Sequence, residues 1–381
     1  MFIHRTIAKT LQKHLSIFPA IGITGPRQSG KSTLLKNMLP EYRYVSFDDY
    51  QTKNFLDSDP VGFINHYSSK VIFDEVQKAP MIFDMIKNVI DNNRDINGNF
   101  ILTGSSQFSM IKGIKESLAG RIGLMQLLPF QRSEIPKHLR DESIYKGSYP
   151  GLVVKDYNYN NEWYSSYIET YINKDVKDIS NLGNLRDFRR FVLLLAAQTA
   201  QPLNMSSYSK ALGVSVPTIK SWISVLEASY IIYLLPPFYT NLSKRIVKTP
   251  KVYFYDTGLV SYLTGIETEK QYSMGPMAGA IFENYVIMDI IKSGMHNCKN
   301  EDYYFLRTHS GEEVDLIIDN RRDKTFIEIK KTETYKADYM KAINMFKGDM
   351  DKGYVVYSGE DMELSDQTGF RNYDGFLTIK L

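Results

Sequence analysis

The chain has one cysteine, no long apolar run and almost no excess of either charge. The single cysteine, Cys298, cannot close a disulfide within the chain, which is typical of a protein from a reducing compartment. The longest apolar stretches, 191–197 and 230–238, are far shorter than the roughly 20 residues of a membrane-spanning helix. Basic residues interrupt the amphipathic segment 1–14, so we expect no signal-peptide core there. We therefore expect a cytoplasmic protein with no membrane segment, whose first helix packs on the domain that follows.

The composition is that of a globular protein with two or three domains. Of the 381 residues, 43% are hydrophobic and 23% are charged, which is enough to build hydrophobic cores. The net charge of +3 hides an asymmetry, because Lys and Arg outnumber Asp and Glu by 19 to 14 in residues 1–150 and by 13 to 10 in 151–274. In 275–381 the acids lead by 19 to 14. We therefore expect nucleic-acid contacts in the first two-thirds and metal sites among the acids of the last third.

A phosphate-binding loop is indicated at 25–33, GPRQSGKST. This stretch matches G-x-x-x-x-G-K-[ST], follows an apolar run at 21–23 and precedes a helical pattern at 34–39, which is the strand–loop–helix context of a P-loop. The alternative is a glycine-rich turn that carries Lys-Ser by chance. In a P-loop, Lys31 reaches the β- and γ-phosphates and the Ser32 hydroxyl binds Mg²⁺. We expect ATP and Mg²⁺ as cofactors, and the nucleotide to be held by Gly25, Pro26, Arg27, Gln28, Ser29, Gly30, Lys31, Ser32 and Thr33.

A strand that ends in two carboxylates follows the loop by about 40 residues. The run 70–75, KVIFDE, is continuously apolar before its acids, as expected of a buried parallel strand. At its carboxyl end Asp74 is expected to hold the Mg²⁺ water shell beside Ser32. Glu75, one residue further on, is expected to polarise the attacking water. The pattern predicts a Walker B strand.

Three further candidates for the ATPase site come after the next predicted strand, 99–102. A polar side chain at the end of this strand can orient the attacking water, so Thr103 and Ser105 are candidates, while Ser106 is equally well explained as a helix N-cap. Arg121 follows a helix that ends in glycine. We expect Arg121 to reach the γ-phosphate of a neighbouring subunit as an arginine finger. The alternative is a cation favoured by the dipole at a helix C-terminus.

The middle of the chain predicts a helical connector and a winged helix. A turn cluster at 147–151 is a plausible domain boundary, and helical patterns cover 163–178 and 185–198. A helix over 206–212, a turn with Gly213 and a second helix from 217 form a helix–turn–helix pattern.

Predicted strands at 231–235 and 252–255 would flank the wing. Residues 206–251 contain one acid, Glu227, and a larger set of bases, which predicts contacts with DNA phosphates. The alternative is a packing or protein-contact module, because the recognition helix offers a weak base-reading set of Pro217, Thr218, Ser221 and Trp222. The six basic residues are Lys210, Lys220, Lys244, Arg245, Lys248 and Lys251.

The last third predicts a second active site. A helix from 280 carries Glu283, and a hairpin of two strands carries Asp315 on the first and Glu328 on the second. Side-chain alternation puts Glu328 and Lys330 on the same face. This geometry gathers Glu283, Asp315 and Glu328 around a divalent metal such as Mg²⁺, with Lys330 beside it, which suits phosphodiester hydrolysis.

Two families resemble this chain. GPRQSGKST, VIFDE, ILTGSSQ, SLAGR and LLPFQRSE occur in the order found in AAA-type ATPases of bacteria and archaea that are fused to a conserved C-terminal region. This resemblance implies an AAA+ ATPase that acts as a homo-oligomeric ring, with a hexamer favoured and active sites shared between subunits.

The D-x12-E-x-K pattern resembles the PD-(D/E)XK nucleases, most closely the archaeal Holliday-junction resolvases. It implies metal-binding and catalytic roles for Glu283, Asp315, Glu328 and Lys330. Val314 stands where that family usually has proline, and the domain is acidic. The alternative is a degenerate nuclease fold used for assembly.

The sequence thus predicts an α/β protein of three domains: a P-loop AAA+ core with a parallel sheet (1–147), a helical and winged-helix middle (148–274) and a restriction-endonuclease-like α/β domain (275–381). We expect an oligomeric ATPase that remodels or translocates DNA and cleaves branched or structured DNA with a metal-dependent site. Two other hypotheses remain: a non-nucleolytic regulatory ATPase whose C-terminal domains bind partners, and a DNA-binding switch controlled by ATP.

Overall fold

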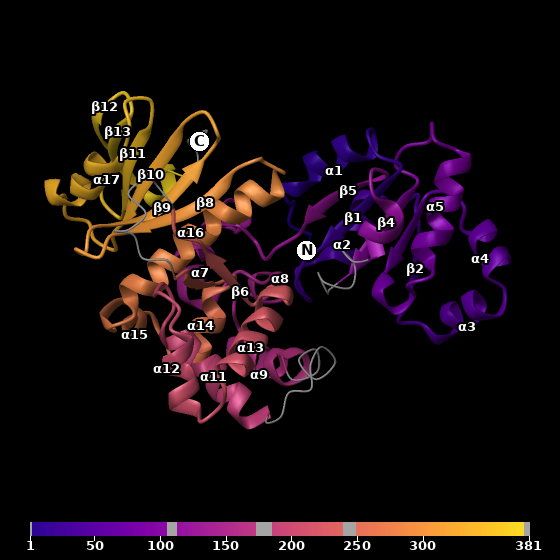
Figure 1. Ribbon diagram of the computed structural model, residues 1–381, viewed down its shortest axis with the longest axis horizontal. Helices are drawn as coiled ribbons and strands as arrows, with labels where there is room; N and C mark the ends of the chain where they lie inside the picture. The colour runs from indigo at the N-terminus through magenta and orange to yellow at the C-terminus, as the bar shows by residue number, and fades with distance from the viewer. Residues whose placement is uncertain (1, 105–112, 173–184, 239–248, 377–381) are drawn as a thin grey trace.

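The computed structural model describes residues 2–104, 113–172, 185–238 and 249–376. Ser105, Ser106 and three bases of the predicted wing, Lys244, Arg245 and Lys248, lie outside these residues. Figure 1 shows the N-terminal lobe on one side of the molecule, with the helical middle and the C-terminal sheet together on the other. Within the described residues, no helix is both long and apolar enough to cross a lipid bilayer.

The N-terminal lobe contains a five-stranded parallel sheet in the order β2-β3-β4-β1-β5. Its strands are β1 (Ala20–Thr24), β2 (Arg43–Ser46), β3 (Val71–Asp74), β4 (Phe100–Gly104) and β5 (Ile122–Gln126). The predicted strands at 21–23, 70–75 and 99–102 are confirmed as β1, β3 and β4, and the alternating pattern at 42–47 forms β2, whereas β5 was not predicted. All residues of β1, β3 and β4 are buried, because helices cover both faces of the sheet.

Two apolar clusters hold these helices on the sheet. One joins α1 to Ile21 and Leu34 through Ile7 and Leu11, which confirms the expected packing of the first helix. The other packs Phe73 of the sheet against the opposite helices. The helices of this lobe are α1 (Ile7–Leu15), α2 (Lys31–Met38), α3 (Tyr50–Ser58), α4 (Pro60–His66), α5 (Ile82–Asn92), a 3-10 turn at Val76–Lys78 and a π-helical turn at Ile114–Leu118.

The middle of the chain contains the predicted helix–turn–helix. Helix α12 (Met205–Leu212) ends at Gly213, whose φ is 68°, and α13 (Val216–Ala228) begins after the N-cap Ser215. Trp222 is only 1% exposed and packs 5.5 Å, between ring centroids, from Phe188. Its assignment to a base-reading set is therefore wrong, because the indole lies in the core.

The other elements of the middle surround this motif. Strands β6 (Ile232–Leu235) and β7 (Lys251–Phe254) pair antiparallel. The pattern at 185–198 forms one helix, and that at 163–178 is helical as far as 172 within the described residues. The helices are α7 (Arg140–Lys146), α8 (Pro150–Val153), α9 (Asn160–Tyr167), α11 (Leu185–Ala197), α14 (Thr257–Thr264) and α15 (Glu269–Met274), with 3-10 turns at Arg132–Glu134 and Lys137–Leu139 and a π-helical turn at Ile168–Ile172.

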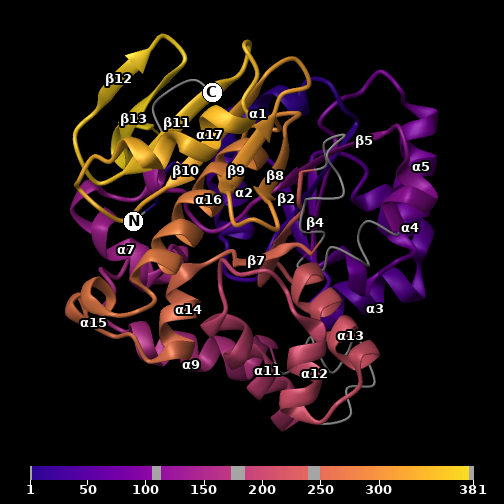
Figure 2. The ribbon, with the colours of Figure 1, turned by 60° about the vertical axis from the view of Figure 1, so that its left-hand side comes forward.

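The C-terminal part consists of the long helix α16 (Ala278–His296) and a six-stranded mixed sheet in the order β12-β13-β11-β10-β9-β8. The predicted hairpin is present as antiparallel β9 and β10. Figure 2 shows β7 next to α16. The remaining elements are β8 (Asp302–Arg307), β9 (Glu313–Asp319), β10 (Lys324–Ile329), β11 (Lys352–Tyr357), β12 (Met362–Ser365), β13 (Thr368–Asn372), α17 (Lys341–Phe346), α18 (Tyr373–Phe376) and a 3-10 turn at Ala337–Met340.

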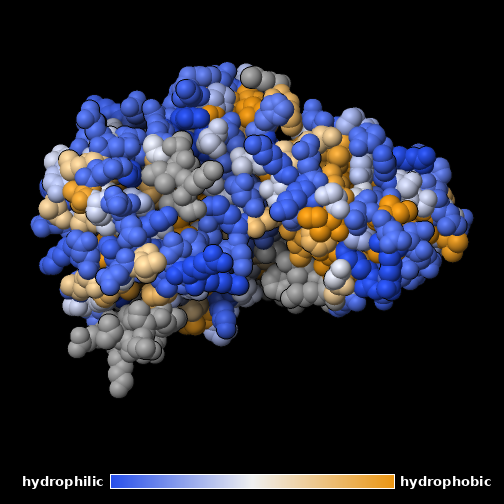
Figure 3. Space-filling model, turned by 90° about the horizontal axis from the view of Figure 1, so that it is seen from above, coloured by the Kyte–Doolittle hydropathy of each residue, from blue (hydrophilic) through white to orange (hydrophobic). Residues whose placement is uncertain are grey.

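The turn cluster at 147–151 is packed inside the molecule. Ser148 and Tyr149 are 2% and 1% exposed, and the Ser148 N–H donates to Asp256 at 2.7 Å. One apolar cluster extends from Leu128 to Phe376 and so includes both the middle and the C-terminal sheet. In contrast, the surface seen in Figure 3 is mostly hydrophilic, with small separate apolar patches. The turn at 147–151 is therefore a buried junction between packed elements and not an exposed linker.

Candidate nucleotide site and C-terminal acidic cluster

The P-loop connects β1 to α2, and its backbone requires glycine at two positions. Gly25 has a φ of 147°, and a Cβ atom there would lie 2.1 Å from the carbonyl oxygen of Leu127. Gly30 has a φ of 92° and directly precedes α2. L side chains avoid both conformations. The loop therefore leads into the N-terminus of α2, whose free N–H groups and positive dipole end form an anion site.

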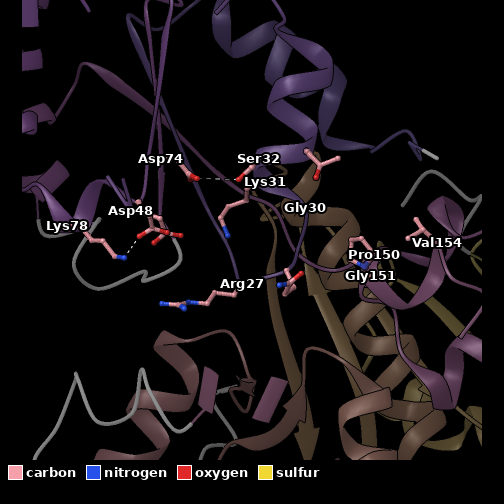
Figure 4. Close-up of a pocket in the computed structure, with 13 residues that line it drawn as sticks. Arg27, Gly30, Lys31, Ser32, Asp48, Asp74, Lys78, Pro150, Gly151 and Val154 are labelled. Atoms are coloured by element: carbon pink, nitrogen blue, oxygen red, sulfur yellow. Dashed lines mark hydrogen bonds and ion pairs between the residues drawn. The ribbon is translucent and has the colours of Figure 1, made fainter. Parts of the chain in front are cut away.

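A cavity of about 780 Å³ opens in front of the P-loop. Figure 4 shows Asp48 and Lys78 on one side of Lys31, and Pro150 and Val154 on the other. The predicted residues that line the cavity are Arg27, Gln28, Gly30, Lys31, Ser32, Thr33, Asp74 and Glu75. The lining residues that sequence reasoning missed are Asp48, Lys78, Pro150, Gly151 and Val154.

Lys31 carries a buried ammonium group in this cavity. Its Nζ donates to the carbonyl oxygens of Gly25 at 2.8 Å and Pro26 at 2.9 Å. Burial lowers the pKa of Lys31 to about 8, while Glu75 and Asp74 act in the opposite direction. A phosphate group would favour the charged ammonium further, because a nearby opposite charge stabilises it.

Asp74 ends β3 and faces the start of α2. Its Oδ2 lies 3.4 Å from Ser32 Oγ, and the hydroxyls of Tyr44 and Thr103 donate to its two oxygens. Ser32 and Asp74 offer the cavity the oxygen ligands that Mg²⁺ prefers, so the pair fits this ion. Thr103 is fully buried and its hydroxyl binds Asp74, so its role in orienting the attacking water stays a prediction. Tyr44 was not predicted, because its contact with Asp74 joins two separate strands.

Glu75 lies at the cavity in a left-handed conformation, with a φ of 57°. For a residue other than glycine this conformation costs about 1 kcal/mol or more, so the surrounding structure must hold it. The Gln77 side-chain amide donates to the Glu75 carboxylate. The arrangement keeps this carboxylate beside the P-loop, where the sequence predicts it.

Arg5 supports the P-loop from behind. Its guanidinium donates to the carbonyl oxygens of Ser29 at 2.9 Å and Leu128 at 2.6 Å, and forms an ion pair with Glu134 at 3.1 Å. Both charged side chains are almost fully buried. Arg5 and Glu134 were not predicted as part of the site, because the contacts of Arg5 with Leu128 and Glu134 join segments more than 100 residues apart.

The four residues predicted to form the second active site do come together in the C-terminal third: Glu283, Asp315, Glu328 and Lys330. Lys330 Nζ lies 2.5 Å from Glu328 Oε1 and 4.0 Å from Asp315 Oδ2. The Ile329 N–H donates to Asp315 at 2.8 Å, and Glu283 reaches the cluster from α16. Burial raises the pKa of Glu283 and of Glu328, while a neighbouring lysine opposes each shift.

A second lysine, which sequence reasoning assigned to DNA contacts, is part of this cluster. Lys251 of β7 is 2% exposed, so it is not available to a DNA phosphate. Its Nζ lies 3.0 Å from Glu283 Oε1 and 3.7 Å from Asp315 Oδ1, and it also pairs with Glu313. We name the set of Lys251, Glu283, Glu313, Asp315, Glu328 and Lys330 the lysine–acid cluster.

The lysine–acid cluster does not fit the expected metal. In the part of the chain that the structure describes, no group of three or more acidic, His or Cys side chains is arranged to hold a metal ion. Lys251 Nζ contacts the carboxylates of Glu283 and Asp315, which were expected to bind the metal. Two cations cannot share that space without strong repulsion. The predicted Mg²⁺ site at Glu283, Asp315 and Glu328 is therefore not present in this arrangement.

Three family models match successive parts of the chain. They describe an AAA domain over residues 18–136, a domain of unknown function (DUF8612) over 137–270 and a domain of unknown function (DUF4143) over 278–372. The region that matches the AAA domain model is the part of the chain that carries the P-loop. Its match includes the P-loop, Asp74, Glu75 and Arg121.

Two curated relatives align with most of the chain. An uncharacterized protein of Mycobacterium tuberculosis is 26% identical over 361 residues, which cover 93% of this chain and 80% of that protein. An uncharacterized protein of Methanocaldococcus jannaschii is 22% identical over 382 residues, covering 90% and 82%. Among solved structures, a Walker-type ATPase of Pyrococcus abyssi matches with a TM-score of 0.49 and 16% identity, over 69% of this chain and 96% of that one.

Arg121 of the AAA domain lies away from its own P-loop. It precedes β5, and its carbonyl oxygen accepts a hydrogen bond from Ala20 at the start of β1, whereas the P-loop follows the end of β1. Its guanidinium forms two hydrogen bonds of 2.9 Å with Asp91. The arginine-finger role stays a prediction, and it requires that Arg121 exchange Asp91 for a phosphate of another subunit.

His296 joins the AAA domain to α16, and its buried ring indicates that the folded state loses stability at acid pH. Its Nε2 accepts a hydrogen bond from the Leu128 N–H at 3.1 Å, while Nδ1 lies 3.3 Å from Gln131 Oε1. The neutral ring can accept at one nitrogen and donate at the other, but the charged ring cannot accept. Burial lowers the pKa of His296 to about 3, so the folded state binds fewer protons than the unfolded state below about pH 6.5. Stability is therefore lost as pH falls from about 6.5 towards 3.

The buried Asp289 acts in the opposite direction, because burial raises its pKa to about 6. It contributes stability that is lost as pH rises through that value. The variant His296→Gln separates the two effects. Between pH 7 and pH 5 the free energy of unfolding of the wild type should fall by roughly 2 kcal/mol through His296. The free energy of unfolding of the variant should fall by that much less, and thermal unfolding at the two pH values measures the difference. Equal losses in both proteins would contradict the role of His296.

Proposed function

We propose that this chain hydrolyses ATP and uses the cycle to change how its winged helix engages DNA. The observation that carries the proposal is the cavity in which Lys31, Ser32, Asp74 and Glu75 converge. Lys31 would hold the β- and γ-phosphates, and Glu75 would orient and polarise the attacking water. Ser32 and Asp74 would hold Mg²⁺, which would supply positive charge to the phosphate oxygens.

A small, mostly apolar pocket beside the cavity supports a binding site for the adenine base. It has a volume of about 60 Å³ and shares Gly30, Thr33, Pro150 and Val154 with the larger cavity. Phe2, Ile3, Leu34 and Phe130, together with Arg5, complete its wall. Contact between the face of a base and these apolar side chains would be favourable.

The nucleotide site is in direct contact with the middle of the chain. Pro150 and Gly151 of α8 line the cavity, and Thr24 Oγ1 at the end of β1 forms a hydrogen bond of 2.7 Å with the Tyr230 hydroxyl, just after α13. A movement of the P-loop would therefore be transmitted through Thr24 and Tyr230 to the end of α13. This supports a coupling between ATP turnover and DNA engagement.

Contact with DNA is proposed for the exposed side of the helix–turn–helix. Lys210 of α12 and Lys220 and Ser221 of α13 are exposed, and in the described part of 206–251 these two lysines are the bases left for phosphate contacts once Lys251 is buried.

The double variant Lys210→Glu/Lys220→Glu should weaken binding to duplex DNA by about tenfold or more and reduce the salt slope by about 2. Binding measured by fluorescence anisotropy at several salt concentrations tests this. The exposed pair Lys336→Glu/Lys341→Glu is the control, and an equal loss in both variants would contradict a specific DNA face.

An oligomer, with a hexameric ring favoured, is proposed to complete the site through Arg121 of a neighbour. The geometry supports this because Arg121 lies where β1 and β5 begin, whereas its own P-loop lies at the opposite end of β1. Metal-dependent cleavage of branched DNA remains the prediction of the nuclease resemblance, and the geometry supports it least. The lysine–acid cluster favours the non-nucleolytic alternative, because Lys251 stands among the expected metal ligands.

Phosphate release with and without duplex or branched DNA tests the main proposal. We expect ATP hydrolysis that DNA stimulates, and no products of DNA cleavage. Hydrolysis that no DNA affects would leave an ATPase but contradict its coupling to DNA.

A further inference from the structure

Lys251 reaches the acidic site of the C-terminal sheet from a different part of the fold. It begins β7, which belongs to the winged helix, and pairs with Leu235 in β6. A β-bridge to Pro202 fixes its backbone from the other side. Because the backbone is held on both sides, the ammonium group is placed in the lysine–acid cluster by the fold and not by a mobile side chain at the surface.

The contacts of Lys251 are those of a site already filled by a cation. Its side chain is 3% exposed and lies within ion-pair distance of Glu283, Glu313 and Asp315. The Tyr253 hydroxyl, two residues further along β7, donates to Glu283 at 2.7 Å. Lys330 takes the other side of the cluster through Glu328.

The three carboxylates expected to bind a metal are also largely buried. The side chains of Asp315, Glu328 and Glu283 are 7%, 10% and 17% exposed. A phosphodiester of duplex DNA has to approach a metal held by these oxygens, and Lys251 and Tyr253 of β7 already contact Glu283 there. The arrangement favours a buried ion-pair network over a catalytic surface.

We infer that Lys251 is the resident cation of this cluster, which ties the winged helix to the C-terminal sheet in place of a divalent metal. The inference does not depend on ATP hydrolysis, since it concerns a cluster that shares no residue with the nucleotide cavity. It has a direct consequence: removal of either partner of a buried pair leaves an uncompensated charge. One cluster oxygen, Glu328 Oε2, is buried and accepts no hydrogen bond from the described residues, so metal binding has to be measured directly.

The first experiment uses the wild-type full chain without nucleotide. Mn²⁺ binding is followed by electron paramagnetic resonance, with Asp315→Asn as the comparison. We expect wild type and Asp315→Asn to bind Mn²⁺ equally weakly, and neither Mg²⁺ nor Mn²⁺ to produce cleavage of branched DNA. Binding that Asp315→Asn abolishes, or cleavage that Lys330→Ala abolishes, would overturn the inference. Neither result depends on whether the Lys251 variant folds.

The second experiment is a double-mutant cycle on thermal stability. Lys251→Met should lower the melting temperature by roughly 5 to 10 °C, whereas the exposed control Lys336→Met should change it by about 1 °C or less. Glu283→Gln should also destabilise the protein. The double variant should lose clearly less than the sum of the two single losses, because the partners share one interaction. Additive losses would show that Lys251 and Glu283 are not coupled and would overturn the inference.

Discussion

Replacing Lys31 by alanine should reduce ATP hydrolysis at least about 100-fold and weaken ATP binding by about 10- to 100-fold. The ammonium group lies in the cavity within hydrogen-bond distance of the Gly25 and Pro26 carbonyl oxygens, and it can move to phosphate oxygens without leaving the loop. Its loss removes a positive charge both from the bound triphosphate and from the transition state. Phosphate release and the binding of a fluorescent ATP analogue measure the two effects separately.

Lys9→Ala is the matched control, because Lys9 is exposed on α1 and does not line the cavity. It should hydrolyse ATP at the wild-type rate. If Lys31→Ala and Lys9→Ala had equal rates, the assignment of the cavity as the ATPase site would be wrong. A melting temperature for each variant shows that the folded state is retained.

Glu75→Gln should lower the turnover number by about 100- to 1,000-fold and leave ATP binding close to that of the wild type. Glutamine has the same shape and can keep a contact with Gln77, but it cannot polarise a water molecule as a carboxylate does. The variant should therefore accumulate in the ATP-bound form. If the winged helix responds to the nucleotide, the DNA affinity of the Glu75→Gln variant in the presence of ATP should stay at one value instead of changing over time.

The exposed acid Glu41→Gln serves as the control for this experiment and should be unaffected in turnover. A Glu75→Gln protein that bound ATP poorly would point to a role of Glu75 in the ground state, and one that turned over normally would exclude it as the polarising group. The comparison of kcat with Kd distinguishes these outcomes.

The P-loop could be predicted from the sequence because its chemistry is contiguous. Nine neighbouring residues supply the glycines, the lysine and the hydroxyl, and the flanking periodicity is enough to place them between a strand and a helix. The same holds for Asp74 and Glu75, which end a buried strand, and for the helix–turn–helix with its Gly213. The hairpin of β9 and β10 also follows from local patterning, and with it the proximity of Asp315 and Glu328.

Only the tertiary structure determines the contacts between segments that lie far apart in the chain. Pro150 and Gly151 look like a boundary turn, but packing of Ser148 and Tyr149 places them on the nucleotide cavity. Arg5 reaches the back of the P-loop from the N-terminal segment. No periodicity within a single segment reports such contacts, because each depends on how whole elements pack.

Lys251 shows the difference most clearly. By composition it is one of six bases around a predicted wing, and a base in such a segment is usually solvent-exposed. The fold turns β7 towards α16 and the C-terminal sheet, so that the charge is buried among carboxylates. The sequence alone therefore determined which residue types are present at both sites. Only the packing of distant elements decided that one site is an open cavity lined by anion-binding groups and that the other has its carboxylates paired with a buried lysine from the neighbouring domain, since burial is a property of the whole fold.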